Sequence, residues 1–500
     1  MQEIVAYQTA MNITRKRLFF LAAFAGGFLS RMGIFRSGYT SDDYVWTLAT
    51  PDSSWHAIHQ GRFLGPLVSH MVEFFGFSQV SLQLPLFILS LFVLSALIAK
   101  LVDVTLSDGA SSWLGIAAAT VAASYPYLTS YYLFRMVLLD QILVYAITLL
   151  AIHVVTDERR SVWQRLLLGS LIVGFGSGDN QLVFMLYTTC AMAWFTATLF
   201  TLINQGRAWL ATPDGSATAR RLTIAPGTVI AGFIIYAITI KLVHVVTGIP
   251  AEDSYSLSIG TGITRIVTTD LQLVLDVLFR GESIIPLYLK ITLLAILLTL
   301  FFQAARKYWK HALVSILFLF AALSLSVAPM AISSGGHVAR IFMCAGFAFA
   351  LFIALMGNFV ERPKFPAVAL FVLSGFYCFS GATMFYQQEV LSAWDQKTAW
   401  SIYMDVARQF NLTINSEIHL VNGKETYPVG LSTYDVDSYG VNESVLRSDW
   451  SYAYPGLFRV ATGRNLKVMS GDPNICLGKP IWPRDGSVFE KSKNAIYVCL

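Results

Sequence analysis

Charged side chains are scarce in this chain of 500 residues, because Asp, Glu, Lys and Arg together make up only 13% of it. A soluble globular protein carries about 25% charged residues, whereas 55% of this chain is hydrophobic. The apolar residues gather in runs of about 20, which is the length that crosses a bilayer as a helix. The scarcity of charge therefore argues against an ordinary soluble protein and predicts a polytopic α-helical membrane protein.

Several patterns that indicate other functions are missing. The sequence contains no HExxH motif, CxxC pair, Walker loop or GxSxG elbow. No basic stripe with interleaved aromatic residues supports nucleic-acid binding. Of the five cysteines, three lie inside apolar runs, where cysteine usually acts as a small hydrophobe. The other two, Cys476 and Cys499, lie in the polar C-terminal stretch and are predicted to form a disulfide if that stretch faces an oxidising compartment.

Eleven apolar runs predict eleven crossings, and the basic residues between them predict their orientation. Arg and Lys concentrate in alternate connections, which by the positive-inside rule face the cytoplasm. This alternation places the N-terminus in the cytoplasm and everything after residue 385 outside. The first run also carries Arg31, which we expect to snorkel to the outer interface. The runs cover residues 17–35, 79–99, 113–132, 136–155, 166–177, 181–203, 224–246, 284–303, 311–332, 341–359 and 366–385.

The composition divides the chain into a transmembrane domain, residues 1–385, and a C-terminal domain, residues 386–500. Residues 36–78 form the first external loop. Residues 247–283 are too polar to span, and their second half has the helical periodicity of a segment lying along the interface. The C-terminal domain has soluble composition and is predicted to be a small α+β unit. It has a helical pattern at 389–410 and strand patterns at 417–423, 466–472 and 494–500.

The first external loop opens on two adjacent carboxylates, Asp42 and Asp43. An unpaired carboxylate is costly inside lipid, so the pair is expected at the water boundary or in a polar cavity. Tyr44 and Trp46 follow within the same stretch. Aromatic rings beside polar groups suit sugar faces, but Trp and Tyr also populate membrane interfaces. Composition alone leaves a binding site and a solvated loop start equally open.

Arginines mark the same side of the membrane. Arg62 follows Gly61 at the end of the loop, where a guanidinium can hold a phosphate through two hydrogen bonds. A juxtamembrane arginine contacting lipid headgroups would look the same. Arg135 and Asp140 share the second external turn, and they suit either a structural ion pair or a site.

Two further external turns carry polar groups. Residues 176–181, "GSGDNQ", place Asp179 and Gln181 where they could bind substrate hydroxyls, or where they simply form a glycine turn. Residues 333–340, "SSGGHVAR", place His337 and Arg340 at a helix start, which favours an anion. This second turn is the best phosphate-binding candidate, although a turn with a snorkelling arginine has the same pattern.

All these clusters fall on one face, and the centres of the apolar runs are nearly free of charge. An ion-coupled transporter would be expected to carry ionisable residues near the bilayer centre. The distribution favours an interfacial enzyme that acts on a substrate embedded in the outer leaflet. The alternative is a protein that is not an enzyme, namely a transporter or flippase for a glycolipid.

The motif "SDDY", residues 41–44, and the aromatic loop ending "GRFLGPL", residues 61–67, resemble the serotype-converting O-antigen glucosyltransferases of bacteria and their phages, the type II glucosyltransferase family. That family is similar to the wider GT-C class. The number of apolar runs, the "GSGDNQ" turn, the arginine before the tenth run and an external tail extend the resemblance along the chain.

The resemblance implies an inverting glycosyltransferase of the bacterial inner membrane with a GT-C-like fold and a periplasmic C-terminal domain. A separate donor synthase and flippase would supply glucose, or a similar hexose, on undecaprenyl phosphate. The enzyme would transfer that sugar to lipid-linked O-antigen of lipopolysaccharide. Teichoic acid, lipid A or protein are alternative acceptors.

The resemblance also assigns roles to residues. Asp42 or Asp43 would be the general base, and Arg62, His337 and Arg340, with Arg135 behind them, would stabilise the leaving phosphate. Substrate contacts are expected from Asp179, Gln181, Tyr44 and Trp46. No cofactor is required, although the adjacent aspartates allow a divalent metal.

Overall fold

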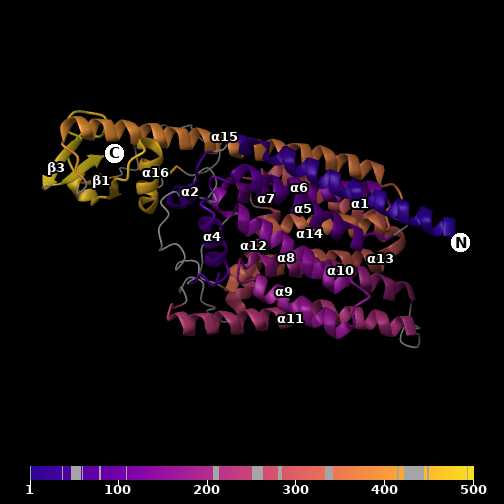
Figure 1. Ribbon diagram of the computed structural model, residues 1–500. Coiled ribbons are helices and arrows are strands. Elements are labelled where there is room, and N and C mark those ends of the chain that lie inside the picture. Colours follow the sequence, from indigo (N-terminus) through magenta and orange to yellow (C-terminus); the bar gives the residue numbers. More distant parts are fainter. Residues whose placement is uncertain are drawn as a thin grey trace.

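The computed structural model describes residues 2–36, 38–46, 58, 60–77, 80–107, 110–205, 213–250, 263–279, 284–332, 342–413, 416–421, 444–446, 450–492 and 494–500. Figure 1 shows a bundle of long helices with a small sheet domain beyond one end and the N-terminus at the other. The bundle helices are α1 (Gln2–Arg31), α2 (Ser41–Trp46), α4 (Gly65–Phe74), α5 (Gln83–Thr105), α6 (Ser112–Ser124), α7 (Pro126–Ser130), α8 (Leu138–Thr156), α9 (Val162–Gly176), α10 (Leu182–Gln205), α11 (Pro213–Thr247), α12 (Ile263–Leu278), α13 (Leu287–Ile332), α14 (Met343–Gly357) and α15 (Lys364–Gln409).

Seven of the described helices are long and apolar enough to cross a membrane. These segments are Ile13–Phe35, Gln83–Thr105, Arg135–Thr156, Leu182–Asn204, Arg221–Thr247, Leu287–Val327 and Lys364–Gln409, and α9 and α14 are shorter apolar helices. The predicted runs 284–303 and 311–332 are joined in α13, which is kinked at Tyr308. The run 113–132 is broken before Pro126 into α6 and α7. The helical membrane class is confirmed, and the number of eleven crossings stays a prediction.

The centre of the bundle is α14, in which every residue from Met343 to Gly357 is buried. Around it, α1 packs closely on the alanine-rich α6, as small residues allow between membrane helices. Arg31 lies in this packing and is fully buried. It donates to the carbonyl oxygen of Ala123 at 2.6 Å, and its guanidinium lies 4.3 Å from the ring centroid of Tyr132. The prediction that Arg31 snorkels to the interface was therefore wrong, because carbonyl and aromatic partners inside the bundle replace water.

The connections predicted to be cytoplasmic meet at one end of the bundle, which we call the basic end. Asp103, after the second run, pairs with Arg15 at 3.1 Å and with Lys16 at 3.2 Å. The same end holds the pairs Arg221–Glu158 and Lys307–Glu361. Tertiary contacts therefore group the connections in the way that the alternation of charge predicts.

The described part of the polar segment 247–283 contains α12, so the helical prediction holds there. Val274 and Val277 are buried, whereas Val267, Leu271 and Leu275, spaced by four residues, are exposed. Lys290 at the start of α13 donates to the backbone carbonyl of Asp276 at 2.8 Å and ties the two helices together. The helix thus offers an apolar stripe on its outer side, and its position in the interface stays a prediction.

The C-terminal domain continues from the bundle through α15, which passes the predicted boundary at residue 385 without a break (Figure 1). Its sheet has the order β2–β1–β4–β3, in which β1 is parallel to both neighbours and β3 is antiparallel to β4. One core joins α15, α16 and the sheet. The remaining elements are β1 (Glu417–Val421), η8 (Ser451–Ala453), α16 (Tyr454–Thr462), β2 (Lys467–Ser470), η9 (Pro473–Cys476), β3 (Val488–Ser492) and β4 (Ala495–Cys499).

The predicted helix at 389–410 and the three predicted strands are confirmed as the end of α15 and as β1, β2 and β4. No predicted strand corresponds to β3. Only Val488 of this strand is buried, and the strand lies at the sheet edge, where polar side chains protect against further pairing. Such a strand lacks the apolar alternation that marks the other three.

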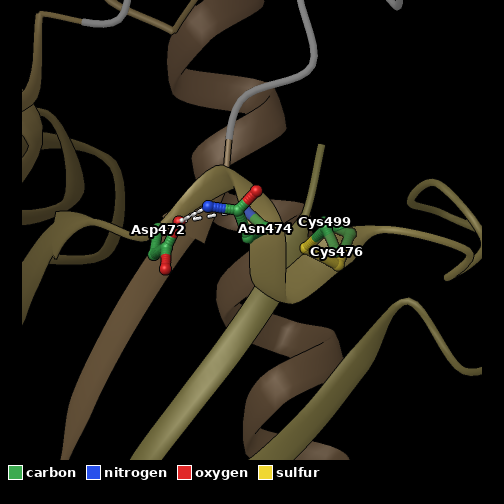
Figure 2. Close-up of a disulfide and its surroundings, with 4 residues drawn as sticks. All are labelled: Asp472, Asn474, Cys476 and Cys499. Atoms are coloured by element: carbon green, nitrogen blue, oxygen red, sulfur yellow. Dashed lines mark hydrogen bonds between the residues drawn. A yellow bond between two sulfur atoms is a disulfide. The ribbon is translucent and has the colours of Figure 1, made fainter.

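The predicted disulfide is also confirmed, since Cys476 is bonded to Cys499. Figure 2 shows the pair beside Asp472, whose carboxylate accepts from the backbone and side-chain N–H groups of Asn474 at the start of η9. The bond ties η9 to the end of β4, so it fastens an irregular segment to the sheet.

Cys476→Ser is expected to destabilise the C-terminal domain by about 3 kcal/mol, the loop-closure contribution for a separation of this size. The cysteines are 23 residues apart. Thermal unfolding and limited proteolysis of the full chain would measure the loss. Cys378→Ser, at a free cysteine, is the matched control. Equal protease resistance of the two variants would contradict the prediction.

Candidate active site

Asp43 is built into the start of α2 and is fully buried. Its Oδ2 accepts from the backbone N–H of Thr40 at 3.0 Å, and Thr40 Oγ1 accepts from the backbone N–H of Asp43 at 3.3 Å, which is a reciprocal capping box. Its Oδ1 accepts from the backbone N–H of Met136 at 3.0 Å. Burial raises the pKa of Asp43 to about 6, although these N–H groups and Arg135 oppose the rise. Both carboxylate oxygens therefore hold the loop together.

Asp42 has a different environment, although it is the adjacent residue. Its side chain is half-buried, and Oδ1 accepts from the hydroxyl of Tyr452 at 3.2 Å. Tyr452 belongs to η8 of the C-terminal domain. Consecutive residues of a helix do not share a face, so α2 presents one aspartate to the interior and the other to the junction with the C-terminal domain.

Tyr44 fastens α2 to α15. The ring is fully buried and stacks on Tyr39 at 5.1 Å between centroids. Its hydroxyl lies 3.0 Å from Ser392 Oγ and accepts from Gln396 Nε2 at 3.1 Å. Gln388, one turn earlier on α15, donates to the carbonyl of Tyr39 at 2.7 Å. Tyr44 therefore lies in the core of the junction, and Trp46 ends α2 with its side chain outside the described residues.

A second polar cluster is formed by Arg62, Asp140 and Asp179. Asp179 is 1% exposed, and neither of its carboxylate oxygens has a hydrogen-bond partner among the residues that the structure describes. Burial, followed by the charge of Asp140, raises the pKa of Asp179, and the charge of Arg62 lowers it. Arg62 is half-buried, and within the described part of the chain its Nε has no hydrogen-bond partner. Two carboxyl groups thus share the field of one guanidinium in a largely water-free place.

The "GSGDNQ" turn positions this cluster against the first loop. The backbone N–H of Leu64 donates to the carbonyl of Gly178 at 2.9 Å. A Cβ on residue 178 would lie 2.1 Å from the ring of Phe63, so this close contact requires glycine. Gln181 Nε2 donates to the carbonyl of Gln60 at 2.6 Å and to the hydroxyl of Tyr236 at 3.2 Å. Gln181 therefore acts as a clamp on the loop that carries Arg62.

The structure brings most of the predicted site residues to one end of the bundle, which we call the site end. Arg135, in η3 (Arg135–Val137), lies with its guanidinium 4.3 Å from the ring centroid of Tyr39 and near Asp43. Asp140, which the sequence paired with Arg135, lies near Arg62. His337 and Arg340 lie outside the described residues, so their roles stay predictions.

Binding of a divalent metal by Asp42 and Asp43 stays a prediction. Both oxygens of Asp43 accept backbone N–H groups, and Oδ1 of Asp42 accepts from the hydroxyl of Tyr452. Ca²⁺ takes six to eight oxygen ligands, and Mg²⁺ is held by one or two carboxylates together with water and phosphate. Among the described residues, no group of three or more His, Cys, Asp and Glu gathers around a common point.

Two features of this site are absent from the predictions made from sequence. The first is the capping box, although the spacing Thr40-x-x-Asp43 is a recognisable signal for it. The second is Tyr452, which lies 410 residues from Asp42 and for which no local pattern indicates a contact.

A protein-family model described as "Glucosyl transferase GtrII" matches residues 32–379. The matched region includes Asp42, Asp43, Arg62 and Asp179 and ends inside α15, before the C-terminal domain. No curated protein matches the chain.

Proposed function

The chain belongs to the Glucosyl transferase GtrII family, and from that premise we propose that it transfers glucose from undecaprenyl-phosphate glucose to lipid-linked O-antigen at the periplasmic face of the bacterial inner membrane. The family match and the long apolar helices establish a membrane glucosyltransferase. The donor, the acceptor and the side of the membrane are the proposal.

Two observations support the periplasmic side. The site end lies opposite the basic end, and basic connections face the cytoplasm. The C-terminal domain, which contacts Asp42, contains the Cys476–Cys499 disulfide. Structural disulfides persist in the periplasm and are rare in the cytosol. A lipid-linked donor suits that compartment, since the sugar can be carried across the membrane already activated.

The environment of Asp42 carries the proposal. Asp43 is fully buried and both of its carboxylate oxygens accept backbone N–H groups, whereas Asp42 is half-buried at the junction of the two domains, next to the hydroxyl of Tyr452. We assign Asp42 as the general base and Asp43 as the residue that positions α2. Asp42 takes the proton of an acceptor hydroxyl, the acceptor oxygen bonds to the anomeric carbon, and the bond from that carbon to the phosphate oxygen breaks. The configuration inverts, and undecaprenyl phosphate leaves with the electron pair.

The cluster around Arg62 suits the donor. A guanidinium stabilises the negative charge that develops on the leaving phosphate. Asp179, whose raised pKa favours a protonated carboxyl, can donate to and accept from sugar hydroxyls. His337, Arg340 and Arg135 remain proposed as further cations toward the phosphate, and no step of this proposal requires a metal.

The full-length protein in lipid nanodiscs, supplied with undecaprenyl-phosphate glucose carrying labelled glucose and with lipid-linked O-antigen, should produce labelled glycan. UDP-glucose in place of the lipid donor should not. Labelling of lipid A or protein instead would show that the acceptor is not O-antigen. Movement of a fluorescent glycolipid between leaflets without any transfer would favour the flippase alternative.

A further inference from the structure

Two aromatic residues of the C-terminal domain are exposed beside Asp42. Trp450 and Tyr452 have 38% and 49% of their surface exposed. Their ring centroids lie 5.6 Å apart at an interplanar angle of 66°, so they meet edge to face. The hydroxyl of Tyr452 donates to Asp42 Oδ1 at 3.2 Å. Large aromatic surface is thus left open to water within hydrogen-bonding reach of the proposed base.

The pair is held rigidly relative to Asp42. Tyr44, two residues after Asp42, belongs to the same hydrophobic core as α16, which follows η8. Gly456 of α16 approaches α2 so closely that a Cβ there would lie 2.0 Å from the carbonyl oxygen of Tyr44. Asp395 of α15 accepts from Ser444 Oγ at 2.7 Å and from the N–H of Val445 at 2.8 Å, and the Val445 carbonyl accepts from the N–H of Trp450 at 3.1 Å.

The chemistry of this surface fits a sugar. A hexose presents C–H groups on its faces and hydroxyls around its rim, and an aromatic ring with a polar tip can contact both. The surface of Trp450 is available for the C–H face, and Tyr452 adds a hydroxyl next to the carboxylate. Two rings meeting edge to face form a corner, which limits the orientation of a bound ring more than a single flat surface does.

The position of the pair favours the acceptor over the donor. The donor phosphate is bound to a polyprenyl chain, so it stays with the bundle, where Arg62 and Asp179 lie. Trp450 and Tyr452 approach Asp42 from the C-terminal domain, which extends beyond α2 and away from the bundle (Figure 1). The base must contact the acceptor hydroxyl, and these rings border the base on that side.

We propose that Trp450 and Tyr452 form the acceptor subsite, in which Trp450 stacks on the acceptor sugar and Tyr452 holds its hydroxyl over Asp42. This inference rests on the proposed function. Both residues lie after residue 379, where the family match ends. The subsite therefore lies outside the region that the family model matches.

Two measurements on the full-length protein in nanodiscs test the proposal. The first is binding of delipidated O-polysaccharide, prepared from the strain that carries the chain, measured by calorimetry without donor. The second is steady-state transfer with the acceptor varied. Trp450→Ala should weaken polysaccharide binding about tenfold, as truncation of an aromatic anchor does. It should raise the acceptor KM similarly while kcat and the donor KM stay near wild type.

Matched variants separate recognition from folding. Trp450→Phe, which keeps a ring, should retain most of the binding. Trp400→Ala removes another exposed tryptophan, 45% exposed and 6.0 Å from the ring of Tyr403, and should bind normally. Tyr452→Phe should keep binding but lower kcat, because the hydroxyl next to Asp42 is lost.

Wild-type affinity in Trp450→Ala, or no polysaccharide binding by the wild type, would overturn the subsite. Failure of the proposed function has a different signature: polysaccharide binding still depends on Trp450, but no glucose leaves the lipid donor. A loss of binding shared equally by Trp450→Ala and Trp400→Ala would also reject the subsite, since it would indicate damage to the whole domain.

Discussion

Asp42→Asn is expected to lower glucosyl transfer by about 10²- to 10⁴-fold, the usual contribution of a positioned general base, while the protein still folds. The amide keeps an oxygen that can accept from Tyr452, but it cannot take a proton from the acceptor hydroxyl. Asp42 is half-buried, whereas the fully buried Asp43 forms the capping box of α2, so the change at Asp42 should cost less stability than the same change at Asp43. Transfer from the labelled lipid donor at matched protein amounts, together with a thermal transition, measures both parts.

Asp43→Asn is the matched comparison, because the same change is made one residue away. Asn has one acceptor oxygen, so its amide group would face a backbone N–H of Thr40 or Met136. A buried N–H left without an acceptor costs about 1–3 kcal/mol, and this variant should melt at a lower temperature. Its activity should fall only to the extent that a less stable α2 displaces Asp42. Full activity in Asp42→Asn with loss in a stable Asp43→Asn would reverse the assignment.

If both variants transferred glucose at the wild-type rate, neither aspartate would be the base. In that case a reaction centred elsewhere would have to replace the proposed mechanism. A glycolipid flippase would gain support only from a different result, in which the wild type itself transfers no glucose.

The sequence predicts the helical membrane class because the signal for it is local. A run of about 20 apolar residues can be recognised without knowing what it packs against. The alternation of apolar and polar residues between turn residues likewise predicted β1, β2 and β4. The failures are tertiary. The sequence predicts Arg31 at the interface, because its hydrogen-bond acceptor, the carbonyl of Ala123, is 92 residues away in the chain.

The candidate site follows the same division. The "SDDY" motif led to the two aspartates, but their roles depend on Met136 and Tyr452, which come from distant parts of the chain. Neighbouring positions along the helix place one carboxylate inside and the other at the domain junction. A sequence pattern reports the pair of residues, whereas the distinction between base and structural cap arises only from their partners.

The Arg62 cluster could not be assembled from spacing either. Arg135 and Asp140 are neighbours in sequence and suggested an ion pair, whereas the structure places Asp140 in the field of Arg62. The contact arises because the "GSGDNQ" turn and the "GRFLGPL" loop pack together through Gly178, Leu64 and Phe63. The "GSGDNQ" turn and the "GRFLGPL" loop, which both belong to the resemblance, are thus parts of one site.

Arg62→Gln is expected to lower kcat by about 10²- to 10³-fold, as removal of one donor aimed at a developing negative charge does, and to raise the donor KM. Arg62→Lys should recover part of the loss, because an ammonium keeps the charge without the two-pronged geometry. Arg36→Gln is the matched control. Arg36 pairs with Glu389 at 3.3 Å with 76% of its side chain exposed, and surface pairs contribute about 0–1 kcal/mol.

A second variant decides whether Arg62 acts on the phosphate or only offsets the nearby acids. In Arg62→Gln alone, Asp140 and Asp179 lose the cation that favours their charged forms, so the variant would lose activity in either case. Adding Asp179→Asn removes one of these carboxyl groups, and with it the cost of burying its negative charge. If the phosphate role is correct, the double variant regains thermal stability but not transfer. Recovery of wild-type kcat in the double variant would show that Arg62 serves only to balance the carboxyl groups, and the leaving phosphate would then have to be stabilised by another cation at the site end.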